Sequence, residues 1–133
     1  MNRKAFTLME LIVIMIIIGV LTGIMVPNYM RAREKTMDKQ ALVILPLIRA
    51  AERNYKIEHG AYYPDAGSIV TSVSDINGNL SLDLVDDNSW QYVLSSDDQT
   101  SFTATMDRNK GGYGRQWSIT ESTSTPVCSG NCP

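Results

Sequence analysis

The chain has 133 residues, enough for one domain, and its formal net charge at pH 7 is −2. A mildly acidic composition, with 12 basic and 14 acidic side chains, gives no electrostatic basis for binding nucleic acid. Because an apolar segment takes up the beginning of the chain, we expect only a small soluble part with a small core.

The beginning of the chain places a small residue between two basic residues and a long apolar run. Arg3 and Lys4 precede Ala5, and the apolar run starts at Phe6. A secretory signal peptide has its small-residue cleavage site after the apolar stretch, whereas here the small residue comes before it. A cut between Ala5 and Phe6 would keep the apolar helix on the mature protein. We therefore expect residues 1–5 to be a leader peptide.

The apolar run predicts a membrane-spanning helix over residues 6–30. Between Phe6 and Asn28 the only charged side chain is that of Glu10. A charge in bilayer hydrocarbon costs about 3 kcal/mol or more, so Glu10 needs a partner, and this need favours assembly. The basic residues before the run predict a single span with its N-terminus in the cytoplasm.

The order of these residues resembles the class III signal of type IV pilins and of the pseudopilins of type II secretion. The matching residues are Lys4, Ala5, Phe6, Thr7, Leu8, Glu10, Leu11 and Pro27. The family usually has glycine where this chain has Ala5. The resemblance implies cleavage between Ala5 and Phe6 by a prepilin peptidase and N-methylation of Phe6. It also implies a filament in which Glu10 neutralises the Phe6 amine of a neighbouring subunit.

The same resemblance implies partners and a location. The partners would be further copies of this chain, minor pilins or pseudopilins, the prepilin peptidase and an inner-membrane assembly platform. The subunit would lie in a bacterial inner membrane before it enters a periplasmic pseudopilus or a cell-surface pilus. In type IV pilins the first proline of the long helix, which corresponds to Pro27, is where the helix can lose its winding in the filament.

Residues 31–59 predict the amphipathic half of the same helix. Apolar residues recur there at steps of three and four, and the charged residues, including Glu52, fall largely elsewhere. We expect one helix from about Phe6 to about Glu58, ended by Gly60. The only histidine, at position 59, then lies at the helix end, where a cation interacts well with the helix dipole.

Pro27 and Pro46 both lie inside this helical pattern. Each proline lacks an amide donor and crowds the carbonyl four residues earlier, so each predicts a bend or a break. The apolar periodicity continues past both prolines, which favours bends.

Residues 60–133 predict a connecting loop followed by a sheet. Gly60–Pro64 resembles the Gly-x-Tyr-Pro stretch that follows the long helix in pseudopilins. Asn77-Gly78 predicts a turn. Ile69–Val73 and Leu80–Leu84 are expected to be short strands.

From Trp90 the apolar period falls to two, which predicts three strands at Trp90–Ser95, Phe102–Met106 and Gln116–Thr120. The glycine-rich segment Asp107–Gly114 predicts a turn. Three strands need a cover for their apolar face, and the upper half of the helix offers one. The fold class is therefore α+β: a long N-terminal helix packed on a small C-terminal antiparallel sheet of about three strands.

Cys128 and Cys132 enclose a short loop at the end of the sequence. Outside the cytoplasm we expect them to form a disulfide. Two thiols without further ligands nearby cannot fill a tetrahedral metal site, so no metal is expected there. A pair of free thiols remains the alternative.

No catalytic set of residues can be argued from spacing, so we expect no enzyme and no cofactor. The acidic pairs Asp86-Asp87 and Asp97-Asp98 are either solvated turn residues or, as in major pseudopilins, calcium ligands. The expected function is that of a structural subunit of a type IV pilus or type II secretion pseudopilus. The alternative is a single-span, membrane-anchored extracytoplasmic binding or enzymatic domain that acts as a monomer.

Overall fold

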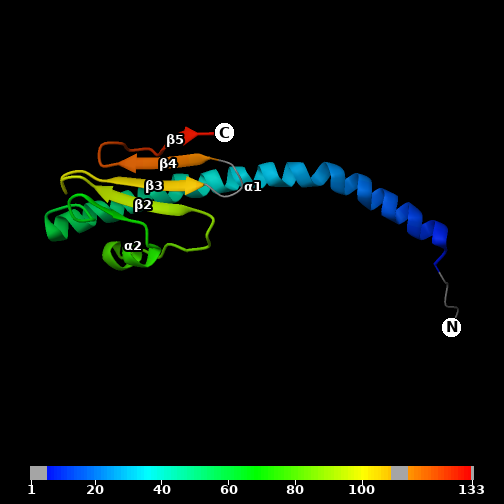
Figure 1. Ribbon diagram of the computed structural model, residues 1–133, viewed down its shortest axis with the longest axis horizontal. Coiled ribbons are helices and arrows are strands. Elements are labelled where there is room, and N and C mark those ends of the chain that lie inside the picture. Colours follow the sequence, from blue (N-terminus) through cyan, green and yellow to red (C-terminus); the bar gives the residue numbers. More distant parts are fainter. Residues whose placement is uncertain (1–5, 109–113, 133) are drawn as a thin grey trace. The chain divides into compact units, whose positions relative to one another are not determined.

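The computed structural model describes residues 6–108 and 114–132. Figure 1 shows the order of its elements. They are α1 (Leu8–His59), β1 (Ser68–Val70), α2 (Val73–Leu80), β2 (Gln91–Ser96), β3 (Thr103–Arg108), β4 (Arg115–Thr120) and β5 (Val127–Gly130). The chain forms two compact units, Met1–Met37 and Asp38–Pro133, so the division between them falls within α1.

Helix α1 is continuous over 52 residues and contains both Pro27 and Pro46. Neither proline ends the helix, so neither produces a break. The helix ends where the sequence predicts, because Gly60 takes a positive φ of 82° and its N–H donates to the carbonyl of Lys56. His59 lies in the last turn as expected, and its ring stacks on that of Tyr55.

In the first unit, α1 is exposed on every side. All residues from Phe6 to Arg33 are exposed, and the most apolar 18-residue window of the helix has none of its residues buried. This is the one helix among the described residues that is long and apolar enough to cross a membrane. A helix that is apolar all round needs lipid or other apolar helices around it.

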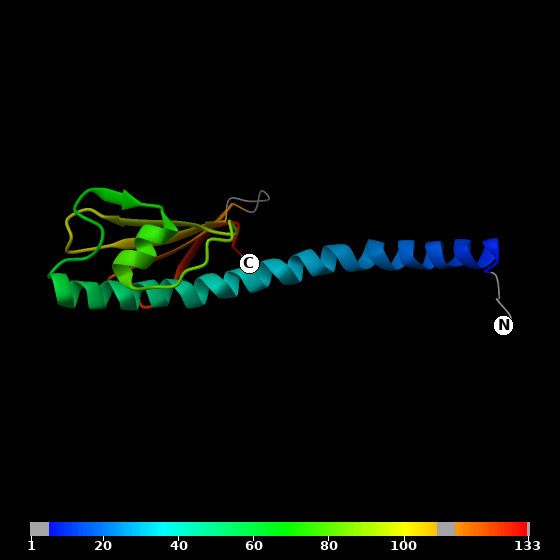
Figure 2. The same cartoon turned by 90° about the horizontal axis from the view of Figure 1, so that it is seen from below.

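The second unit is a five-stranded antiparallel sheet in the order β1-β2-β3-β4-β5. The part of α1 that belongs to this unit covers one face of the sheet, and α2 lies beside it (Figure 2). Inward side chains alternate with outward ones along each central strand, as in β2 and β3. The core between helix and sheet includes the buried side chains of Leu45, Ile48, Leu94, Phe102, Ala104, Met106 and Ile119.

The α+β class is confirmed, and the sheet has five strands where about three were expected. The three predicted central strands are present as β2, β3 and β4, with bounds shifted by one or two residues. The two additional strands lie at the sheet edges. β1 overlaps the short strand predicted at Ile69–Val73, whereas β5 has four residues, too few for an alternating pattern to stand out in the sequence. The turn predicted at Asp107–Gly114 lies largely outside the described residues.

The strand predicted at Leu80–Leu84 and the turn predicted at Asn77-Gly78 are wrong. Both overlap α2, which begins where the Ser72 side chain accepts a hydrogen bond from the N–H of Asp75. Ile76 and Leu80 are one helical turn apart and both are buried, so packing outweighs the weak helix propensity of this segment.

Candidate functional site: the start of the long helix and a pocket at the sheet edge

The first turn of α1 is closed by Thr7 and Glu10. The N–H and the hydroxyl of Thr7 donate to Oε2 of Glu10 at 2.9 and 3.0 Å, and the Glu10 N–H donates to the Thr7 hydroxyl at 3.3 Å. This reciprocal arrangement is a capping box, with Thr7 at the N-cap and Glu10 three residues later. Glu10 therefore stabilises the start of the helix in the subunit itself.

The capping role of Glu10 was not part of the sequence prediction. The signal was present, because Thr7-Leu8-Met9-Glu10 has the Thr-x-x-Glu spacing of a capping box. The sequence prediction instead assigned Glu10 a partner on another subunit, because a charge within an apolar run needs one.

Two of the predicted site residues lie together. Phe6 and Glu10 line the same shallow hollow of about 380 Å³, which Thr7, Met9, Val13 and Ile14 complete. Pro27 lies about 25 Å further along the helix at 1.5 Å per residue. Ala5, the other half of the expected cleavage site, lies outside the described residues. The pairing of Glu10 with a neighbour's amine stays a prediction.

Cys128 and Cys132 form the expected disulfide. Cys128 belongs to β5, where it is the register partner of Trp117 in β4. The bond closes a loop at the outer edge of the sheet, far in sequence from the apolar helix.

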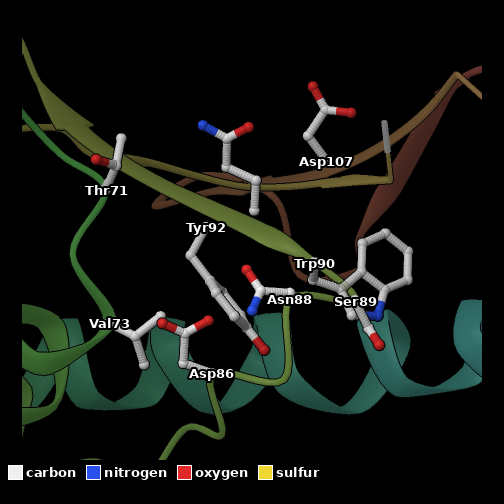
Figure 3. A pocket seen from close by; sticks show the side chains of 9 residues that line it. Thr71, Val73, Asp86, Asn88, Ser89, Trp90, Tyr92 and Asp107 are labelled. Carbon is white, nitrogen blue, oxygen red and sulfur yellow. The ribbon is translucent and has the colours of Figure 1, made fainter. Parts of the chain in front are cut away.

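A separate pocket of about 430 Å³ lies in the second unit where β2 begins. Figure 3 shows its polar lining. The lining residues are Thr71, Val73, Asp86, Asn88, Ser89, Trp90, Gln91, Tyr92 and Asp107. Because Tyr92 points inward and Gln91 outward, the pocket wraps around the edge of β2. Of these lining residues, only Asp86, as part of the Asp86-Asp87 pair, is a candidate ligand by its sequence pattern.

The two acidic pairs have different surroundings. Asp98 accepts hydrogen bonds from the backbone and hydroxyls of Thr100 and Ser101, and these bonds lower the pKa of its carboxyl to about 2. This carboxylate is therefore committed to its own turn. Asp86 faces the pocket. Within the described residues no group of three or more metal-ligating side chains is present, and calcium at Asp86-Asp87 stays a prediction.

Comparison with known proteins agrees with the properties of the helix. Residues 1–26 match the family described as the prokaryotic N-terminal methylation motif. The chain is 26% identical over 125 residues to the type IV wide pilus major component PilA4 of Thermus thermophilus, an alignment that covers 91% of this chain and 94% of that protein.

The type II secretion system core protein G of Vibrio cholerae is 29% identical over 127 residues, which cover 85% of this chain and 87% of that protein. The Escherichia coli protein of the same name is 35% identical over 61 residues, but these cover only 46% of this chain and 42% of that protein. No solved structure matches the chain significantly.

These findings describe a protein that begins with an N-terminal methylation motif and has an exposed apolar N-terminal helix followed by a small α+β body. Over most of its length the chain is similar to a type IV pilus major component and to a core protein of the type II secretion system.

Proposed function

We propose that a prepilin peptidase cuts this chain between Ala5 and Phe6, that the new amine of Phe6 is methylated, and that the mature subunit polymerises through α1. The observation that carries this proposal is the predominantly apolar surface of α1 from Phe6 to Met30, which is exposed throughout and which a single subunit leaves without any cover. The match of residues 1–26 to the N-terminal methylation motif supports the processing step.

Glu10 would act twice in this scheme. In the single subunit it caps α1 through Thr7. In the filament the same carboxylate would neutralise the Phe6 amine of a neighbour and set the register between the two helices. Because both charges are desolvated in a helix bundle, leaving either one unpaired costs about 3–5 kcal/mol. The packing itself would come from the apolar side chains, and the partners would be other copies and minor subunits on an inner-membrane platform.

Glu10→Gln separates the two roles better than Glu10→Ala. Glutamine at the third helical position also completes a capping box, so α1 should begin normally in this variant. It carries no charge for the neighbouring amine, so filaments should be lost. The control is Thr7→Ser, which retains a capping hydroxyl and leaves Glu10 in place.

The test uses cells that express the chain with a prepilin peptidase and an assembly platform. N-terminal mass analysis of the wild type should give a chain that begins at a methylated Phe6, and electron microscopy of sheared material should show filaments. Glu10→Gln should be processed and retained in the membrane without forming filaments. An unprocessed wild type that begins at Met1 and stays monomeric would instead support the membrane-anchored domain. Normal filaments from Glu10→Gln would refute the pairing mechanism.

A further inference from the structure

The charges of this chain are segregated along the sequence. From Ile57 to Asp107 there is no lysine or arginine, whereas this segment holds nine acidic residues. In contrast, three basic residues, Arg31, Arg33 and Lys35, follow closely on the apolar run of α1. Separate surfaces of opposite sign on one protein favour association of one copy with another.

The basic segment belongs to the first unit and has no internal ion partner. Arg31, Arg33 and Lys35 are all exposed, and none of them makes an ion pair with any residue that the structure describes. Arg31 and Lys35 are four residues apart, so they project from the same face of α1, where like charges repel each other. An acidic partner outside the subunit would relieve this repulsion.

Two carboxylates, those of Asp86 and Asp107, line the pocket at the edge of β2. Beside it the Arg108 guanidinium donates to the carbonyl of Ser89. Asp107 is paired in register with Gln91 and stands on the outer face of the sheet, while Asp86 approaches from the inner side beside Tyr92 (Figure 3). The carboxylates thus flank the strand edge from both faces. A long cationic side chain that enters edge-on would meet a carboxylate on either side.

This part of the β2 edge is also open. β1 pairs only with Leu94, Ser95 and Ser96, so the beginning of β2 has no strand on its β1 side, whereas β3 pairs with it on the other side. The carbonyl of Ser96 points toward the β1 side of β2, where it accepts a hydrogen bond from the N–H of Gly67. Carbonyls two and four residues apart in a strand point to the same side, so the carbonyl of Tyr92 also points toward the β1 side. The pocket therefore offers a backbone acceptor between its carboxylates.

Tyr92 is a further sign that the pocket is built to receive a polar group. Its side chain is only 3% exposed and lines the pocket, yet its hydroxyl makes no hydrogen bond with any described residue. The hydroxyl is not among the fully buried polar atoms of the described residues that lack a partner, so it remains open to the pocket and free to bond with a group that enters there. A basic side chain or a water molecule that accompanies it would supply such a group.

We propose that this pocket on one subunit receives Arg31 or Lys35 from a second copy of the chain. The contact rests on the filament assembly proposed above and adds to it a second, polar junction between subunits, outside the apolar helix bundle. Arginine and lysine both suit a site of carboxylate, carbonyl and hydroxyl oxygens, because both donate several hydrogen bonds and accept none.

Charge reversal tests the contact. The double variant Asp86→Lys/Asp107→Lys should reduce filament yield roughly tenfold or more, because it brings like charges together. Arg31→Glu/Lys35→Glu should do the same, and the chain that carries all four substitutions should recover filaments. Matched controls reverse exposed charges elsewhere: Asp97→Lys and Arg53→Glu should each leave the yield unchanged. The processed subunit in the membrane fraction is quantified for every variant.

Cysteine cross-linking provides a measurement that does not depend on reversed charges. Asp86→Cys combined with Arg31→Cys or Lys35→Cys should give a ladder of disulfide-linked multimers in assembled filaments. Asp86→Cys combined with Arg53→Cys should give none. Because the native Cys128–Cys132 pair is already bonded, it should not contribute to the ladder.

The outcomes separate this contact from the proposed function. Suppose the wild type forms filaments, the Asp86→Lys/Asp107→Lys variant forms as many, and neither position 31 nor position 35 cross-links to position 86. The contact is then refuted while polymerisation stands. If reversal abolishes filaments without recovery in the fourfold variant, and wild-type filaments dissolve on calcium chelation, the pocket is a cation site and the contact is refuted. If the wild type forms no filaments, the proposed function fails and this contact fails with it.

Discussion

At the scale of single residues, Glu52 is the side chain whose environment departs most from the sequence expectation. The helical pattern placed it among the charged residues away from the buried face, but it is 0% exposed. Its Oε2 accepts a hydrogen bond of 3.0 Å from the N–H of Tyr63, which holds the loop after α1 against the helix. Burial raises the pKa of this carboxyl to about 7, although the bond from Tyr63 opposes the rise.

This raised pKa makes the stability of the second unit dependent on pH. The unfolded chain releases the Glu52 proton near its ordinary value of 4.5, whereas the folded chain keeps it up to about 7. The free energy of unfolding should therefore fall as pH rises from 4.5 to 7, by up to about 3 kcal/mol. Glu52→Gln retains an acceptor for Tyr63 and should remove this dependence. The stabilities of the wild type and of Glu52→Gln are measured by thermal unfolding in detergent at pH 5 and at pH 8. An equal pH dependence of stability in the two proteins would contradict the prediction.

At the scale of elements, β5 depends on a close approach between two backbones. Gly130 has a φ of 89° and is the register partner of Arg115. A Cβ at position 130 would overlap the carbonyl oxygen of Gly114. Only glycine fits there, both because the φ is unfavourable for other residues and because the space is occupied.

Gly130→Ala should therefore detach β5 from β4 and leave the central strands paired. We expect a loss of about 1–3 kcal/mol in the unfolding free energy. Amide hydrogen exchange should accelerate in β5 and not in β2 or β3. The control is Gly78→Ala in α2, where an added Cβ meets no atom within 4 Å and φ is not positive. That variant should be neutral or slightly stabilising, because alanine suits a helix better than glycine.

At the scale of the whole molecule, a buried polar cluster joins the helix and the sheet of the second unit. Asp38 of α1 forms an ion pair of 2.9 Å with Arg115 of β4, and the Trp117 indole N–H donates to the same carboxylate at 3.3 Å. Arg49 adds a bond from its guanidinium to the carbonyl of Glu121. These contacts link residues that are more than 70 positions apart in the sequence.

Asp38→Ala leaves the charge of Arg115 buried without this partner, and we expect it to lower the unfolding free energy by about 3–5 kcal/mol. Chemical denaturation of the full chain in detergent, followed by Trp117 and Trp90 fluorescence, measures the loss. Arg53→Ala, a truncation of an exposed cation on the same helix, should change stability by no more than about 0.5 kcal/mol. If Asp38→Ala and Arg53→Ala lower the unfolding free energy by similar amounts, the buried polar cluster makes no specific contribution to stability.

Several features of this protein follow from its sequence alone. The long uncharged run, the order from Lys4 to Leu11 and the three- and four-residue periodicity predicted a single long helix with an apolar first half. The two-residue alternation after Trp90 predicted the three central strands. These patterns are local, because the period of an element and the composition of a membrane segment can be read from neighbouring residues.

Other features were decided by the tertiary structure. The edge strand β5 exists because the longer β4 lies beside it, and α2 forms because Ile76 and Leu80 have a core to enter. Asp38 is buried because Arg115 and Trp117 meet it from a distant strand. The pocket at β2 likewise depends on where β1 stops and on which carboxylates the sheet brings to its edge. Each of these depends on contacts between distant residues, and no local pattern in the chain encodes such contacts.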